Sequence, residues 1–191
     1  MKKKIIIAIT GATGSIYGIR MLEMLQAVEG IETHLILSSA GALTASSESQ
    51  HDKQSIQKLA DVVHHYKDIG ATLASGSFIT HGMVIAPCSM RTLGAIANGI
   101  ADNLITRAAD VMLKERRRLT LMVRETPLNL VHLRNMTTLT EMGAIIAPPV
   151  PSFYTNPASI NDIVNQTVGR TLDTLDITIP DSVKRWKGLN P

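Results

Sequence analysis

Several features that decide protein class are scarce in this 191-residue sequence. A single cysteine, Cys88, excludes an internal disulfide and any CxxC redox or metal motif. No apolar run approaches the roughly 18–20 residues that span a bilayer, so we expect no membrane span. The short apolar run after the N-terminal lysines leads directly into a glycine-rich turn, so we interpret it as a strand and not as a signal peptide. Together these features favour a cytoplasmic protein.

Charge and metal-binding patterns are also weak. The formal net charge is only +3, which suits anionic small ligands and is too small to indicate nucleic-acid binding. Among the histidines, His64 and His65 are adjacent and would diverge on a helix or strand, while His132 has no partner four residues on. We therefore predict no metal site. Cys88 has no assignable activating base, so we interpret it as a small buried apolar residue.

The sequence does contain a regular alternation of strand and helix patterns. Apolar β-formers predict strands over 5–9, 32–37, 83–86, 119–123 and 144–147, with Pro87 ending the third. Helical spacing predicts helices over 16–28, 40–47, 93–97, 104–116, 130–142 and 160–175, and residues 53–63 form an amphipathic segment. This alternation predicts an α/β fold of three αβα layers around a mostly parallel, Rossmann-like sheet.

Residues 1–175 form one predicted domain, because no repeat or flexible linker interrupts the alternation. Residues 148–154 are a proline-rich loop that we expect to be stiff. The tail, residues 176–191, has no periodic apolar pattern, yet it carries Arg185 and Trp186. A tryptophan in such a tail usually packs, so we expect the tail to lie on the body or on a neighbouring subunit.

Polar or charged residues follow nearly every predicted strand. In strand order they are Gly11–Ser15, Ser38-Ser39, Pro87–Thr92, Arg124-Glu125 and, beyond the last strand, Tyr154. Open α/β sheets bind ligands beyond the carboxyl ends of their strands. The convergence therefore predicts a ligand site at that edge of the sheet.

The turn Thr10-Gly11-Ala12-Thr13-Gly14-Ser15 indicates the kind of ligand. It precedes a predicted helix, and a helix N-terminus behind a loop of small residues suits a phosphate. The loop is not GxGxxG, Ser38-Ser39 stands where a dinucleotide fold has an acidic residue, and no Walker motif is present. A mononucleotide fits best, with FMN as the natural candidate. The alternative is a tight βα turn that binds nothing.

Two carboxylates are candidates for proton transfer. Arg124-Glu125 directly after a strand can hold a phosphate or carbonyl and keep a carboxylate poised, or it can be a structural salt bridge. Glu48 stands among hydroxyl residues after a short helix, and its alternative is simple surface solvation.

Four further residues are candidates for binding a second anion. Tyr154 and Arg170 can both reach one, since arginine binds phosphates bidentately. Arg107 and Lys114 lie about two helical turns apart on one predicted helix face. For Lys114 the alternative is a solvated surface charge.

An ordered set of segments resembles the UbiX/Pad-type flavin prenyltransferases, from the first strand to the tail. The segments are Thr10–Gly14, Ser38, Ala86–Leu93, Arg107–Val111, Leu113–Arg117, Arg124–Leu128, Pro148–Tyr154 and Arg185–Gly188. Each segment alone is weakly diagnostic, whereas the ordered set is specific. The PASANT motif of the related cysteine decarboxylases is absent.

The resemblance implies a flavodoxin-like Rossmann sheet that binds FMN. It implies transfer of a dimethylallyl group from dimethylallyl monophosphate to N5 and C6 of reduced FMN. The product, prenylated FMN, would serve a UbiD-type decarboxylase in ubiquinone synthesis or aromatic acid decarboxylation. The resemblance also implies a homo-oligomer, a dodecamer built from trimers, with the active site at a subunit junction.

The resemblance also implies roles for individual residues. Those that would hold FMN are Gly11, Ala12, Thr13, Ser38, Ser89, Met90, Arg91, Thr92 and Arg124. Those that would bind the prenyl phosphate are Tyr154, Arg170, Lys114 and Arg107. Glu48, Glu125 and the hydroxyl of Thr13, a position where many relatives have serine, would manage protons.

The implied chemistry suits these residue types. Lysine, arginine and tyrosine can stabilise charge on a leaving phosphate without a metal, in keeping with the absence of an Asp-rich metal motif. Two alternatives stay open. One is an FMN-dependent decarboxylase acting directly on an aromatic or phenylacrylic acid. The other is a non-catalytic flavin carrier, which would not need a second group of anion-binding residues.

Overall fold

The computed structural model describes residues 2–180 and 182–188 and contains one six-stranded sheet. The strand order is β3-β2-β1-β4-β5-β6, and every neighbouring pair is parallel. The strands are β1 (Lys3–Ile9), β2 (Ile31–Leu37), β3 (Val62–His65), β4 (Gly82–Cys88), β5 (Arg118–Val123) and β6 (Ile145–Ile146). This strand order is that of the doubly wound Rossmann fold, and it confirms the Rossmann-like α/β architecture that the sequence predicts.

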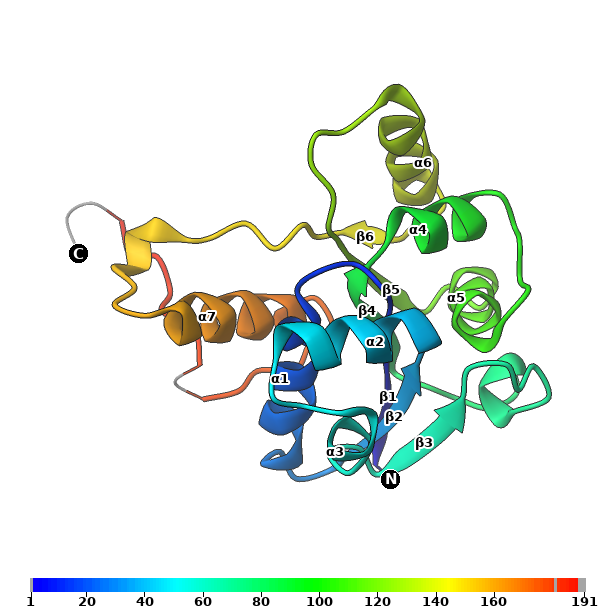
Figure 1. Cartoon of the computed structure of the whole chain (residues 1–191), viewed down its shortest axis with the longest axis horizontal. Helices are drawn as coiled ribbons and strands as arrows, with labels where there is room; N and C mark the ends of the chain where they lie inside the picture. The colour runs from blue at the N-terminus through cyan, green and yellow to red at the C-terminus, as the bar shows by residue number, and fades with distance from the viewer. Residues whose placement is uncertain (1, 181, 189–191) are drawn as a thin grey trace.

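Helices cover both faces of the sheet (Figure 1). They are α1 (Ser15–Gln26), α2 (Ser39–Glu48), α3 (Lys53–Gln57), α4 (Met90–Ala97), α5 (Leu104–Lys114), α6 (Leu130–Glu141) and α7 (Ile160–Asp173), with short 3₁₀ turns η1 (Thr72–Ala74) and η2 (Phe153–Thr155). One buried cluster joins β1 and β2 to α1 and α7, and the other joins β1 and β4 to α4 and α5. No helix of the described residues is long and apolar enough to cross a membrane.

The unbroken apolar run of β1 follows from its central position. Ile5, Ile7 and Ile9 belong to the cluster on one face, and Ile6 and Ala8 to the cluster on the other. All five side chains are fully buried. A strand covered on both faces needs apolar residues at every position, so alternation is absent.

Two details differ from the sequence prediction. Residues 53–63 resolve into the short helix α3 and the start of β3, a four-residue edge strand whose polar histidines obscure its pattern. The third predicted strand does not end at Pro87, because β4 continues to Cys88 with a shift of register against β5. Pro87 lacks an N–H, but its carbonyl accepts a hydrogen bond from Thr10 Oγ1 at 2.7 Å, which ties the end of β4 to the end of β1.

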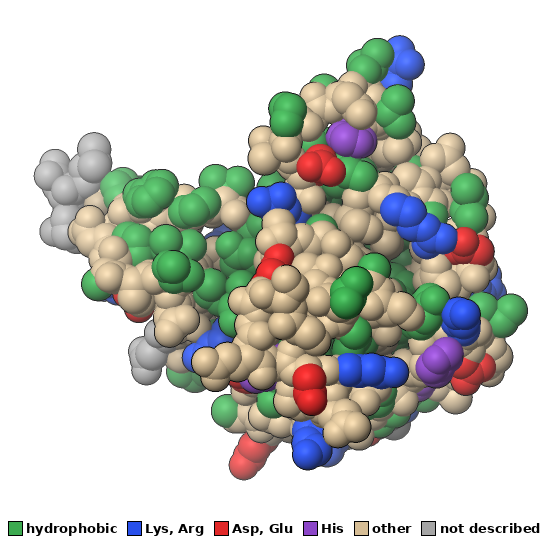
Figure 2. All heavy atoms as spheres, viewed as in Figure 1, with side chains coloured by type: hydrophobic (Ala, Val, Ile, Leu, Met, Phe, Trp, Pro, Cys, Tyr) green, Lys and Arg blue, Asp and Glu red, His purple; other side chains and the backbone are tan. Residues whose placement is uncertain are grey.

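Residues 148–173, with the tail residues 182–188 that pack on them, form an arm (Figure 1). The proline-rich segment runs in extended form from β6 to η2, and α7 returns along α1. Figure 2 shows apolar side chains gathered on this arm and on the region of α6. The large exposed ones on the arm are Val150, Phe153, Tyr154, Ile160 and Trp186, and those around α6 are Leu128, Leu130, Val131 and Leu133. Patches of this kind mark interaction surfaces.

Candidate functional site

A cavity of about 850 Å³ lies at the carboxyl ends of the central strands. Its lining comes from the ends of β1, β2, β3 and β4 and from the start of α5: Thr10, Gly11, Ser38, Ser39, Ala40, Tyr66, Lys67, Ile69, Ser89, Arg91, Thr92, Asp102, Asn103 and Ile105. This is the edge where open parallel sheets bind ligands.

Two helices begin at this cavity with serine caps. Ser38 caps α2 by accepting from the N–H of Gly41 at 2.9 Å, and Ser89 caps α4 by accepting from the N–H of Thr92 at 3.4 Å. The positive ends of both helix dipoles therefore face the cavity. Gly11 makes this close approach possible, because a Cβ there would lie 2.6 Å from the Cβ of Ala40 in the first turn of α2. The cavity thus brings together two helix N-termini and several hydroxyls, an arrangement that suits an anion.

The N-terminus of α1 is not the open phosphate site that the sequence predicts. The carboxylate of Glu48 accepts from the N–H groups of Gly14 and Ser15, at 2.9 and 3.2 Å, and from Ser15 Oγ at 3.1 Å. Burial acts to raise the pKa of Glu48, but hydrogen bonds from Thr13, Gly14 and Ser15 outweigh it and hold the pKa below its usual value. Glu48 therefore caps the first turn of α1 as a carboxylate. The proton-transfer role that the resemblance implies for it stays a prediction.

The residues at the cavity fit FMN. A volume of about 850 Å³ lies within the range of about 300–1,000 Å³ typical of cofactor pockets. The hydroxyls at the ends of β1, β2 and β4 and the N-termini of α2 and α4 suit the phosphate and the ribityl chain. Tyr66, Ile69 and Ile105 provide an apolar wall for a ring. FMN, when bound here, would supply the ring to which the resemblance assigns the prenyl group.

Five of the nine residues expected to hold FMN line the cavity, and four do not. Those that line it are Gly11, Ser38, Ser89, Arg91 and Thr92. Ala12, Thr13 and Met90 belong to the same turns without lining it. Arg124 follows β5, and its N–H donates to the carbonyl of Cys88 at 3.2 Å, so Arg124 and Glu125 stand beside the end of β4.

Several residues near the site were not predicted from the sequence. The cavity is also lined by Tyr66, Lys67, Asp102, Asn103 and Ile105. Of these, only Asp102 and Asn103 could have been found from the sequence, because they form a helix-capping pattern just before α5. Tyr17 lies near Arg124. Burial raises the pKa of its hydroxyl, and the Arg124 guanidinium offsets part of that rise.

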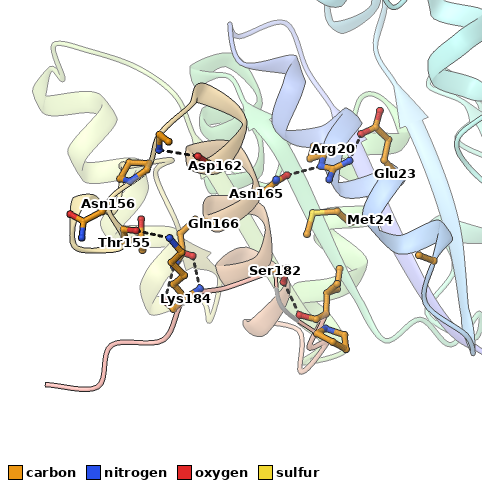
Figure 3. Close-up of a pocket in the computed structure, with 15 residues that line it drawn as sticks. Arg20, Glu23, Met24, Thr155, Asn156, Asp162, Asn165, Gln166, Ser182 and Lys184 are labelled. Carbon is orange, nitrogen blue, oxygen red and sulfur yellow. Dashed lines mark hydrogen bonds and ion pairs between the residues drawn. The ribbon is translucent and has the colours of Figure 1, made fainter. Parts of the chain in front are cut away.

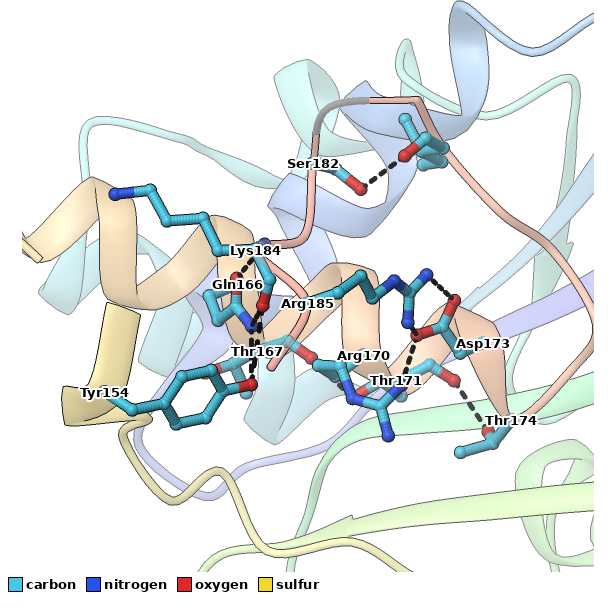
Figure 4. Close-up of polar contacts among 11 residues, drawn as sticks. Tyr154, Gln166, Thr167, Arg170, Thr171, Asp173, Thr174, Ser182, Lys184 and Arg185 are labelled. Atoms are coloured by element: carbon cyan, nitrogen blue, oxygen red, sulfur yellow. Dashed lines mark hydrogen bonds and ion pairs between the residues drawn. The ribbon is translucent and has the colours of Figure 1, made fainter. Parts of the chain in front are cut away.

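Tyr154 and Arg170 lie together on the arm, away from the cavity lining (Figure 4). Gln166 Nε2 donates to the Tyr154 hydroxyl at 3.4 Å, and Arg170 forms an ion pair with Asp173 at 2.6 Å. Trp186 packs edge-on against the Tyr154 ring, with 5.6 Å between ring centroids. This cluster presents a phenol and a guanidinium on one face of α7.

Within one chain, Arg107 and Lys114 belong neither to the cavity lining nor to the Tyr154–Arg170 cluster. Arg107 donates to the carbonyl of Ala74 at 3.1 Å and pairs with Asp110 at 2.6 Å. Lys114, the last residue of α5, pairs with Glu115. Since α5 runs back toward the start of β5, Lys114 lies at the opposite end of the sheet from the cavity.

A second cavity, of about 620 Å³, lies between α1 and the arm (Figure 3). Its polar side chains bind one another: Arg20 Nε donates to Asn165 at 2.7 Å, and Lys184 Nζ donates to the carbonyl of Thr155 at 2.9 Å. It contains none of the predicted site residues.

Thiol and metal chemistry find no support among the described residues. Cys88 is fully buried, and burial raises the pKa of its thiol to about 12, so it stays protonated. Across residues 2–180 and 182–188 no three His, Cys, Asp or Glu side chains are grouped so that they could hold a metal ion.

Comparison with known proteins is consistent with this geometry. Residues 1–172 match the Flavoprotein family. The chain is 54% identical over 187 residues to the flavin prenyltransferase UbiX of Escherichia coli K12, covering 97% of this chain and 99% of that one.

Two crystal structures have closely similar folds. AnUbiX (PadA1) in complex with FMN and dimethylallyl pyrophosphate superposes with a TM-score of 0.96 at 47% identity, over 98% of this chain and 99% of that one. A dodecameric FMN-dependent UbiX-like decarboxylase from E. coli O157:H7 gives a TM-score of 0.94 at 44% identity, over 97% and 100%. The chain belongs to the Flavoprotein family and, within it, to the UbiX flavin prenyltransferases.

Proposed function

We propose that this chain transfers a dimethylallyl group from dimethylallyl monophosphate to N5 and C6 of reduced FMN. The observation that carries the proposal is that groups suited to binding an anion occur at two separate places. One is the cavity with its two helix N-termini, and the other is the Tyr154–Arg170 cluster on the arm. A flavin carrier needs only the first. A relative at 47% identity is known in complex with FMN and dimethylallyl pyrophosphate.

The cavity residues bind and orient the flavin in this proposal. Ser38, Ser89 and the first turns of α2 and α4 hold the phosphate, because they combine hydroxyls with positive helix dipoles. Arg124, which follows β5 beside the end of β4, would help to hold the flavin. Glu48 holds the β1–α1 turn, and with it the hydroxyl of Thr13, in a fixed position.

Residues of the arm and of α5 bind the prenyl donor. As the bond between the allylic carbon and the phosphate oxygen breaks, negative charge builds on the leaving phosphate. Tyr154, Arg170, Lys114 and Arg107 stabilise that charge by donating hydrogen bonds to it. For the ring to close, the double bond of the prenyl group takes up one proton and C6 loses one. Glu125 would be the base that accepts the proton from C6.

The two groups meet between subunits in this proposal. Within one chain, Tyr154, Arg170, Arg107 and Lys114 all lie outside the cavity lining. The apolar surfaces of the arm and of the α6 region are exposed and suit burial against further copies of the chain. One relative is dodecameric. We propose that this chain also forms a dodecamer, built from trimers, with each active site at a subunit junction.

The product of the proposed reaction is a modified flavin that must pass to another enzyme. We propose a UbiD-type decarboxylase as the recipient, acting in ubiquinone synthesis or on aromatic acids in the cytoplasm. Support for this step comes from membership of the UbiX family rather than from any surface of the chain.

Release of inorganic phosphate tests the proposal. Purified protein, reduced FMN and dimethylallyl monophosphate are incubated without oxygen, with each component omitted in turn. We expect phosphate only when all three are present. A direct decarboxylase would instead release CO₂ from an aromatic or phenylacrylic acid without any prenyl donor. A carrier would do neither.

A further inference from the structure

Asp102 lies on the rim of the flavin cavity and forms an ion pair across it. Its Oδ2 accepts from Arg91 Nη2 at 2.5 Å, and both residues line the cavity. Arg91 belongs to the first turn of α4, whereas Asp102 comes just before α5. The pair therefore connects the starts of two helices at the cavity mouth.

The carboxylate of Asp102 is held in place by its own side of the cavity. Its Oδ1 accepts from Asn103 Nδ2 at 2.8 Å and from Thr106 Oγ1 at 3.4 Å. Asn103 and Thr106 are buried and form the capping box of α5. The next N–H, that of Leu104, donates to the carbonyl of Tyr66 at 2.8 Å, which anchors this corner to the end of β3. Asp102 is therefore a rigid acceptor.

The side chain of Arg91 depends on that acceptor. It is 60% exposed, and its one ion pair among the described residues is with Asp102, whose side chain is 47% exposed. Exposed ion pairs contribute little to folding stability. Fixing a long side chain before a ligand arrives, in contrast, reduces the entropy lost on binding. The Arg91–Asp102 ion pair is therefore better suited to preparing Arg91 for a ligand than to stabilising the fold.

We infer that Asp102 is a positioning residue, which holds the Arg91 guanidinium at the cavity rim so that its free N–H groups donate to the FMN phosphate. The inference rests on the proposed flavin function. A guanidinium has five N–H donors, so the bond to Asp102 leaves others available. If Asp102 only repelled the phosphate through space, removing its charge would raise the affinity for FMN. If Asp102 positions Arg91, removing its charge lowers that affinity, so the direction of the change distinguishes the two.

Titrations of FMN and riboflavin, followed by flavin fluorescence, test this role with Asp102→Asn. We expect FMN affinity to fall about tenfold, the size of one weakened charge-assisted hydrogen bond. Riboflavin affinity should stay unchanged, because riboflavin lacks the phosphate. The control is Glu23→Gln, which removes the Arg20–Glu23 ion pair of α1, outside the flavin cavity, with side chains 38% and 32% exposed. It should leave both affinities unchanged.

A double-mutant cycle shows whether Asp102 acts through Arg91. Arg91→Gln should weaken FMN binding, and adding Asp102→Asn to it should cause no further loss. The inference is overturned if Asp102→Asn leaves FMN affinity unchanged or tightens it, or if it weakens riboflavin equally. It is also overturned if the two losses add. If the unaltered protein binds neither flavin, the proposed function itself fails; if it binds FMN and only the Asp102 effects are missing, this inference alone fails.

Discussion

The carboxylate of Glu48, the last residue of α2, accepts a hydrogen bond from the N–H of Ser15, the first residue of α1, at 3.2 Å. The residue at the N-cap of α1, Gly14, has a left-handed backbone with φ of 94° and no side chain with which to cap the helix. Glu48 supplies that cap from a distant part of the sequence. It thereby fixes the turn that carries Thr13 beside the flavin cavity.

Replacing Glu48 by glutamine should lower the free energy of unfolding by about 0.5 kcal/mol at neutral pH, a value discounted for the exposure of the site. The pKa of Glu48 is depressed in the folded state. Its contribution is therefore present above the unfolded pKa and is lost as the pH falls through the folded pKa. Urea denaturation at about pH 7 and about pH 3 measures this. An equal difference between the two proteins at both pH values would contradict an electrostatic cap.

Replacing Asp173 by asparagine should release the tail from α7. Asp173 pairs with Arg170 at 2.6 Å and with Arg185 of the tail at 2.5 Å (Figure 4). Burial acts to raise the pKa of Asp173, but the two arginines outweigh it and hold the pKa below its usual value, so the tether should weaken only as the pH falls through that depressed pKa. Trypsin should cut the variant faster at Lys184, Arg185 or Lys187.

The control for the tail experiment is Asp52→Asn, because Asp52 caps α3 and asparagine is an equally good cap. It should leave the cleavage rate unchanged. Unaltered cleavage in Asp173→Asn would show that the tail is held by its other contacts, such as that between the N–H of Lys184 and Gln166 at 2.8 Å.

Replacing Glu125 by glutamine should preserve FMN binding and stop product formation. Glu125 is exposed directly after β5, and its Oε1 accepts from the N–H of the neighbouring Thr126 at 3.0 Å. Loss of a general base lowers turnover by roughly 100-fold or more. Single-turnover kinetics with pre-bound FMN measure this, with Glu141→Gln at the end of α6 as the control. Normal turnover in Glu125→Gln would remove this residue from the mechanism.

Mixing two inactive variants tests the shared site. Lys114→Ala and Tyr154→Phe should each impair prenyl transfer, because both side chains are proposed to contact the donor phosphate. If a site takes these residues from different subunits, some sites in mixed oligomers are intact and activity returns. Co-expression of two differently tagged variants, purified through both tags, provides the mixed oligomers. If no activity returns in such oligomers, Lys114 and Tyr154 of each active site come from the same subunit.

The strands that the sequence predicts well are those buried on both faces. β1 and β4 have continuous apolar runs, and in β5 a single buried threonine, Thr120, interrupts the run. β3 is harder to predict, because it is a four-residue edge strand with alternate exposure and two histidines. Pro87 suggests a strand end, yet the ladder continues past it through a change of register.

The site is predictable only where short segments carry their own signal. Ser38 and Ser89 are recognisable as helix caps after strands, and both line the cavity. The cap that Glu48 provides for α1 joins residues 33 positions apart, so no local pattern reveals it. Arg107 and Lys114 have a predictable helix face, but their proposed role depends on a second subunit.

Mass spectrometry of the extracted flavin tests the central claim most directly. Purified protein is incubated without oxygen with reduced FMN and dimethylallyl monophosphate, and the flavin is then released and weighed. The proposed function predicts a flavin heavier by one C5 unit, formed only with active protein and prenyl donor together. FMN that stays tightly bound and is recovered unmodified would contradict prenyl transfer and leave a decarboxylase or a flavin carrier.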